Sequence, residues 1–362
     1  MIAPAHHHRR GMTLIELLVV VVILALLSVT VLPNLSNTTD GRRFREAARG
    51  ISSFIARAQA RAINAPGPRG FMIQPLAADP RAGIDIFMAD APPPYGGQSA
   101  SSRVVVLDPT SAGPTKRLKF IQTIGRPPMP AIDGATRDFI RTGPGFADGD
   151  SIQFAGLGHS FMLLMPATSP DTTPDLKISM WQEVGRNPSN TPWPRTPSAG
   201  VPFRILRQPR RASSGIYQAQ RGAAIDLPYS CIGTQPLADP TLAARDRLVK
   251  DLSRPIVLLF DAAGRPQELV HSGGMRMRIT EPLFLLIGSS ELAGNPPVGG
   301  QPRGDQGGAE RTGANWQHDD SVWLCIDNNT GVVKFGTVTP NASSLIGSQF
   351  DIRQTVGQGT AE

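Results

Sequence analysis

The pattern of apolar and polar positions divides the chain into an apolar segment, an amphipathic segment and a long remainder. Residues 13–32 contain a single charged side chain, that of Glu16. A helix of this length covers about 30 Å, the thickness of the hydrocarbon core of a bilayer. The pattern therefore predicts a membrane-spanning helix over residues 12–33.

An amphipathic helix is predicted after this segment. Pro33 removes a backbone donor and is expected to kink or break the first helix, before a polar stretch at 34–41. Apolar residues then recur at spacings of three and four from Phe44 to Ala62, and arginines fill most of the other face. The sequence thus predicts a second helix within 34–65 that ends before the proline-rich turn at 66–68 and packs on a sheet.

The remaining residues, 66–362, read as strands separated by turns rich in Pro and Gly. We expect an α+β fold in which a mainly antiparallel sheet packs against the amphipathic helix. Residues 90–250 are predicted to be a large insertion in this β-rich head. The predicted strands are 83–88, 103–107, 160–165, 203–207, 256–260, 275–279, 283–287, 322–326 and 331–335.

Charge indicates the orientation of the apolar segment. Arg9 and Arg10 precede it, and no Lys or Arg follows it until Arg42. This bias predicts that residues 1–11 face the cytoplasm and that the head lies on the other side of the membrane. The formal net charge is +7, an excess that favours a solvated surface over nucleic-acid binding.

Three interpretations compete for the N-terminal segment. A cleaved secretory signal needs a small-residue cleavage site, for which residues 26–30 are poorly suited. A plain membrane anchor explains the length but not Glu16, since an ionised residue at membrane depth costs about 2.5 kcal/mol or more. A basic leader, Gly11, an apolar run and Glu16 together resemble the type IV prepilins, a family that includes the pseudopilins of type II secretion.

This resemblance implies how the N-terminus is processed and used. Prepilin peptidase, a membrane enzyme, would cut between Gly11 and Met12, remove the leader 1–11 and methylate the new amine of Met12. Most family members carry Phe at that position. Glu16 would meet the amine of Met12 on a neighbouring subunit, and two buried charges are tolerable when they pair. The expected partners are prepilin peptidase, other pilin or pseudopilin subunits and the lipid of the inner membrane, with the head in the periplasm.

Short motifs in the head resemble a smaller group within the family. Residues 54–63 followed by 70–73 are similar to the helix end and first strand of pseudopilin H and the FimT-like minor pilins, and 256–266 to their strand and Asp-x-x-Gly turn. The resemblance implies a structural subunit of a pilus or pseudopilus. The alternative function is a minor pilin of an uptake system that captures DNA.

Catalytic and metal-binding patterns are weak. Residues 6–8 are three histidines in the leader, and the segment 156–160 lacks the frame of a nucleophile elbow. The segments 148–150, 318–320 and 327–331 read as polar turns, because their ligand number and spacing do not fit a metal loop. We therefore expect no enzyme activity, cofactor or metal.

Two cysteines leave two alternatives open. Cys231 and Cys325 both follow the apolar segment, so export would allow them to form a disulfide. A pair of buried free thiols fits the sequence as well.

Overall fold

The computed structural model describes residues 14–107, 115–124, 129–142, 146, 149–155, 160–164, 176–179, 195–220, 222–243, 247–299, 312–339 and 342–358. Helix α1 (Leu14–Ile63) has 50 residues. The chain stays helical through Pro33 and residues 34–41, so the predicted break is wrong. A proline removes only its own N–H bond, and the turns on both sides supply the rest, while the low helix propensity of the polar stretch is a weak constraint. A kink at Pro33 stays a prediction, and the two predicted helices are one.

The C-terminal half of α1 packs on the main sheet as its periodicity predicts. The apolar positions that recur at spacings of three and four from Phe44 to Ala62 are buried, whereas Arg42, Arg49 and Arg57 are exposed on the other face. The helix ends at Ile63, before the predicted turn. The amphipathic pattern therefore identified both the helix and its packing face.

The main sheet has eleven strands among the described residues, and all of its ladders are antiparallel. Their order is β15-β14-β13-β1-β2-β11-β16-β17-β18, with β10 paired to β2 and β12 paired to β11. The strands are β1 (Arg69–Pro75), β2 (Ala82–Asp90), β10 (Arg210–Gln218), β11 (Ala223–Ile232), β12 (Gln235–Pro236), β13 (Ile256–Phe260), β14 (Pro266–His271), β15 (Met275–Arg278), β16 (Leu283–Ser289), β17 (Val322–Ile326) and β18 (Val333–Thr337).

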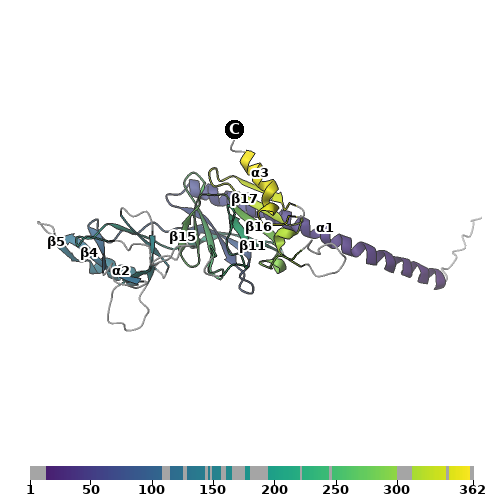
Figure 1. Ribbon diagram of the computed structural model, residues 1–362, viewed down its shortest axis with the longest axis horizontal. Coiled ribbons are helices and arrows are strands. Elements are labelled where there is room, and N and C mark those ends of the chain that lie inside the picture. The colour runs from purple at the N-terminus through teal and green to yellow at the C-terminus, as the bar shows by residue number, and fades with distance from the viewer. Residues whose placement is uncertain are drawn as a thin grey trace, which may run out of the picture.

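Helices and short turns cover both faces of this sheet (Figure 1). Residues of α1 and of β1, β13, β16 and β17 form one core. On the other face Phe284 and Trp323 pack with Ile352 of α3 (Phe350–Gln358) and with Trp316 of η4 (Asn315–Gln317). Burial on both faces explains why β11, β13 and β17 are buried at every position.

A second sheet is inserted between β2 and β10, which pair with each other where Asp90 lies opposite Arg210. Its strand order is β3-β4-β8-β7-β6-β9, with β5 paired to β4. Figure 1 shows this sheet at the end of the molecule opposite the N-terminal part of α1. The elements are β3 (Ser102–Leu107), β4 (Thr115–Ile124), β5 (Met129–Ile132), α2 (Gly134–Thr142), β6 (Ser151–Phe154), β7 (Ser160–Leu164), β8 (Leu176–Ser179) and β9 (Phe203–Leu206).

The second sheet closes on itself. Val104 of β3 donates its N–H to the carbonyl of Val201 at 2.9 Å, and the N–H of Val201 donates back at 3.0 Å. Val201 leads into β9, so this exchange joins the two outer strands. The interior is filled by apolar side chains that include Phe120, Phe154 and Phe161. We refer to this unit, residues 102–206, as the barrel.

The structure bears out an α+β class with antiparallel sheets, and each of the nine predicted strands overlaps an observed one. Within the predicted insertion 90–250, residues 210–218, 223–232 and 235–236 belong to the main sheet as β10, β11 and β12. The main sheet therefore draws on segments from both sides of the barrel.

Candidate functional sites: a buried carboxylate and the N-terminal helix

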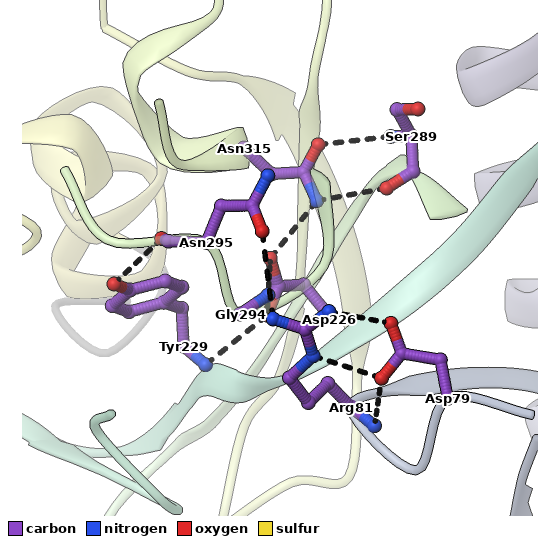
Figure 2. Close-up of polar contacts among 8 residues, drawn as sticks. All are labelled: Asp79, Arg81, Asp226, Tyr229, Ser289, Gly294, Asn295 and Asn315. Carbon is purple, nitrogen blue, oxygen red and sulfur yellow. Dashed lines mark hydrogen bonds and ion pairs between the residues drawn. The ribbon is translucent and has the colours of Figure 1, made fainter. Parts of the chain in front are cut away.

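A fully buried carboxylate lies on β11, where the ladder to β16 is interrupted after Asp226. Its oxygens accept from the N–H of Gly294 at 3.2 Å, from the N–H of Tyr229 at 3.4 Å and from Nδ2 of Asn315 at 2.9 Å. Figure 2 shows these donors converging on Asp226 from three segments of the chain. All three are N–H groups, so each needs an acceptor at this position.

The surrounding side chains hold the donors in place. Oδ1 of Asn315 accepts from the N–H of Ser289 at 2.9 Å, while Nδ2 donates to the carbonyl of Ser289 at 3.0 Å, so the amide has one favourable orientation (Figure 2). The hydroxyl of Tyr229 donates to the carbonyl of Asn295 at 2.9 Å. Asp226 thus sits inside an ordered network rather than in a solvent-filled site.

Burial dominates the electrostatics of this carboxyl group. It raises the pKa of Asp226 from 3.8 to about 7, against the opposing effects of the three donors and of Arg81. Arg81 is itself paired with Asp79 through two contacts of 2.8 Å. The positive charge of Arg81 therefore interacts with two carboxylates, which limits how far it lowers the pKa of Asp226.

The cysteines are free and buried, so of the two alternatives the disulfide is wrong. Cys231 on β11 and Cys325 on β17 lie opposite the same residue, Phe284 of the intervening strand β16. Two strand spacings separate their Cα atoms by about 9–10 Å, whereas a disulfide needs about 4.4–6.8 Å. Burial raises the pKa of each thiol to about 12.

The Cys231 thiol is part of a hydrogen-bonded core contact. It donates to the carbonyl of Tyr229 at 3.1 Å and accepts from Nε2 of Gln349 at 2.9 Å. Because the thiol is neutral and hydrogen-bonded, Cys231 has the character of a structural cysteine and not of a nucleophile.

The polar turns considered as metal ligands have local partners. Oδ1 of Asp327 accepts from the N–H groups of Asn329 and Thr330 at 3.1 and 2.7 Å, as an Asx turn does. Nε2 of the buried His318 lies 3.1 Å from the carbonyl of Thr312. Within the described ranges, no group of three or more His, Cys, Asp or Glu side chains is arranged to hold a metal ion. His159 and Asp148 lie outside the described residues.

The N-terminal part of α1 has a different character, because its apolar side chains face solvent. From Leu14 to Leu26 every residue is exposed, and Leu14 reaches 83%. Glu16 lies in the first turn, where a carboxylate interacts favourably with the helix dipole. Figure 1 shows this part projecting beyond the head. Exposed apolar surface of this extent marks a site of contact with lipid or protein.

The predicted processing site precedes this helix. Gly11 and Met12 lie outside the described residues, as does the rest of the leader. Across the helices of the described part of the chain, none combines the length and apolar character that a membrane crossing requires.

The N-terminal region matches the family model for the prokaryotic N-terminal methylation motif over residues 6–32. No curated protein and no solved structure matches the chain significantly. The chain therefore carries a prepilin-type methylation motif, which indicates a type IV pilin-like substrate of prepilin peptidase. The match includes Gly11, Met12 and Glu16, and it supports no particular subgroup of the family.

Sequence reasoning missed Asp226 as a site residue. One signal was present, because Asp226 is the only charged residue in the otherwise apolar or small-residue run 223–232. Its partners Gly294 and Asn315 are remote in sequence, so the network itself follows only from the topology.

Proposed function

We propose that the protein is a structural subunit of a type IV pilus-like or type II secretion pseudopilus filament, and not an enzyme. The observation that carries the proposal is the exposed apolar part of α1, from Leu14 to Leu26, which lies within the matched methylation motif at residues 6–32. In the bacterial inner membrane this surface is covered by lipid, and in the filament by the helices of neighbouring subunits. The head lies in the periplasm.

In this proposal the N-terminal residues have defined roles. Prepilin peptidase cleaves after Gly11 and methylates the amine of Met12. Glu16 then meets that amine on a neighbouring subunit and guides assembly. The physical reason is that a carboxylate among apolar side chains is costly alone and tolerable beside a positive charge.

Replacement of Glu16 by Ala tests this role. The variant is expected to be processed and inserted in the membrane normally, while its incorporation into filaments, measured by cross-linking, falls at least about tenfold, as for loss of a buried ion pair. Glu46→Ala is the matched control, since Glu46 is exposed on the same helix and faces Gln220 of the head at 3.1 Å. Equal incorporation of both variants would contradict the pairing.

Mass spectrometry of the purified protein tests the processing independently. The mature chain is expected to begin at N-methylated Met12. A chain that retains residues 1–11 with an unmodified start would exclude the filament proposal.

Within the family we place the protein closest to pseudopilin H and the FimT-like minor pilins. The motif segments 70–73 and 256–260 support this assignment, because they lie side by side as β1 and β13. A Cβ atom on Gly70 would lie 1.7 Å from the carbonyl oxygen of Leu258, so the pairing requires glycine. Cross-linking to the other minor subunits of either system would test the placement.

DNA capture is the second candidate function, and one observation favours it. Arg45, Arg49 and Arg57 are exposed along one row of α1 at multiples of four residues. Arg45 and Arg49 are four residues apart, a spacing at which like charges are unfavourable in an isolated helix, and a polyanion would offset the repulsion. The test is a gel shift of the full-length protein at two salt concentrations, with Arg49→Gln/Arg57→Gln as the variant. DNA binding predicts a shift that weakens steeply with salt and with the substitutions, and no shift at low salt excludes it.

A further inference from the structure

Three arginines flank a single carboxylate at the point where the main sheet leads into the barrel. Asp90 ends β2, and its partners in the two ladders are Arg69 on β1 and Arg210 on β10. Paired residues of an antiparallel ladder project from the same face of the sheet. This is the face that α1 covers, because Arg69 is also paired with the core residue Phe260. Arg61, in the last turn of α1, contacts Asp90 from the helix.

The contacts within this cluster are long. Nη2 of Arg61 donates to the two oxygens of Asp90 at 3.3 and 3.4 Å, and Nε of Arg69 lies 3.7 Å from Oδ1. By contrast, the two contacts between Arg81 and Asp79 are 2.8 Å. Nη1 of Arg61 is buried and has no hydrogen-bond partner in the described part of the chain. A buried donor without an acceptor is costly, so a further acceptor beside Arg61 would stabilise the cluster.

The cluster also carries an excess of positive charge. Three guanidinium groups and one carboxylate give a formal net charge of +2. Asp261, on the turn that follows β13, does not reduce this excess, because it is paired with Arg265 at 2.9 Å. The arginine side chains are partly exposed on α1 and β1 and exposed on β10, so a ligand can approach them from solvent.

We propose that Arg61, Arg69 and Arg210 form a binding site for a doubly charged phosphate group, and that Asp90 contacts the guanidinium groups when no phosphate is bound. A phosphate monoester carries a charge of about −1.5 to −2 at pH 7 and has three acceptor oxygens, which matches the charge excess and the three guanidinium groups. A carboxylate or a phosphodiester carries a single charge and leaves part of the excess unmatched. The ligand is held by hydrogen bonds and ion pairs alone. The site concerns the head and is independent of filament assembly.

Isothermal titration calorimetry of the full-length protein in mild non-ionic detergent and low salt tests the site. The probes are inorganic phosphate and methyl phosphate at about pH 8, where both are doubly charged because their second pKa is near 6, with dimethyl phosphate and acetate as singly charged comparisons. We expect the doubly charged probes to bind at least about tenfold more tightly, as for one additional charge-assisted hydrogen bond.

The pattern of affinities also identifies the source of the phosphate. Equal affinity for inorganic and methyl phosphate supports the site and indicates an esterified phosphate, whereas a tenfold preference for the inorganic ion supports it and indicates free phosphate. Failure of both doubly charged probes to bind overturns the proposal. Equal affinity for dimethyl phosphate also overturns it and assigns the arginines to contacts with a nucleic-acid backbone.

Matched variants assign the binding to this cluster. Arg69→Gln and Arg210→Gln each remove one guanidinium group and should weaken the binding of methyl phosphate about tenfold. Arg204→Gln, the same substitution at an exposed position of strand β9 in the barrel, is the control and should bind as the wild type does. Asp90→Asn removes the competing carboxylate and should tighten binding, a result that a purely structural cluster would not give. If Asp90→Asn does not fold, the arginine variants decide, and equal affinity of these variants, the control and the wild type overturns the proposal.

Discussion

The main sheet and the barrel bury their strands in different ways. Strands β13 and β17 of the main sheet are buried at every position, because α1 covers one face and other elements cover the opposite face. Strand β4 of the barrel alternates between exposed and buried positions along its first half, since only the interior is apolar. The same antiparallel pairing thus produces a continuous apolar run in one region and an alternating pattern in the other.

The two regions also have separate cores. Among the residues that the structure describes, none belongs both to the α1-covered core of the main sheet and to the barrel interior. They meet through polar and backbone contacts, such as the bond of 2.7 Å from Arg276 to the carbonyl of Arg207, the residue that directly follows β9. At the same junction Gly149 and Gly274 approach so closely that a Cβ on Gly274 would lie 2.0 Å from the oxygen of Gly149. We therefore expect the two regions to unfold as separate cooperative units.

Phe260→Ala is expected to have the largest effect on this comparison. Phe260 is fully buried in the main sheet, with its ring centroid 6.0 Å from that of Phe71. Loss of such a ring should lower the free energy of unfolding of the main sheet by about 3–5 kcal/mol. Hydrogen exchange in rising urea should show the loss in β1 and β13 and no change in the barrel.

The reciprocal change is Phe161→Ala in the barrel, where the ring lies 5.4 Å from that of Phe154. It should weaken β6 and β7 and leave β13 and β17 intact. If either variant lowers protection equally in both regions, they form one cooperative unit and the comparison fails.

His271, at the barrel-facing end of β14, should make the main sheet sensitive to acid. Burial lowers the pKa of His271 from 6.5 to about 4, with a smaller effect from Lys250. The unfolded chain then binds a proton more readily than the folded one, so the stability that neutral His271 provides is complete above pH 6.5 and is lost as the pH falls through 4. A shift of roughly 2.5 units corresponds to about 3 kcal/mol.

The measurement is the difference in unfolding free energy between the wild type and His271→Asn over this pH range. Asn keeps a polar group near Nδ1, which lies 3.1 Å from the Ser272 hydroxyl. The raised pKa of Asp226 acts in the opposite direction, because its contribution is greatest at low pH and is lost as the pH rises through about 7. The wild type and His271→Asn both contain Asp226, so its contribution cancels in the difference between their unfolding free energies. Equal acid sensitivity of the two proteins would show that His271 is not the responsible group.

The strands that could be predicted from the sequence are those in which the residues of the strand are themselves apolar and are bounded on both sides by residues that favour turns. Strands β13 and β17 are apolar runs between turn residues, and the predicted bounds are those observed. Strand β11 was not predicted, because Asp226 and Pro228 interrupt its apolar character. Strand β4 was missed because Lys116 occupies one of its buried positions and interrupts the alternation of apolar and polar residues in the sequence.

The two candidate sites also differ in whether they could be predicted from the sequence. The methylation motif is contiguous, so local residues sufficed to find it, and the family model matches the same region. The Asp226 network joins segments that are 68 and 89 residues away from it in sequence. Local propensity also misjudged Pro33, where the surrounding helix continued through the proline. Features that depend on contiguous residues could therefore be predicted from the sequence, whereas contacts between segments distant in the sequence could be identified only from the structure.

Val201→Pro tests the feature that most clearly separates the barrel from the open main sheet, its closed seam. The substitution removes the N–H that Val201 donates to the carbonyl of the buried residue Val104. An acceptor left buried without its partner costs about 1–3 kcal/mol, so the barrel should lose stability by that amount. Val201→Ala keeps the N–H and is the matched control. Exchange at Val104 and along β9 should rise in the proline variant alone, while the main sheet, which ends at the edge strands β15 and β18, should not respond. If both variants behave alike, side-chain packing rather than the backbone bridge holds the seam, and the barrel is better described as a curved open sheet.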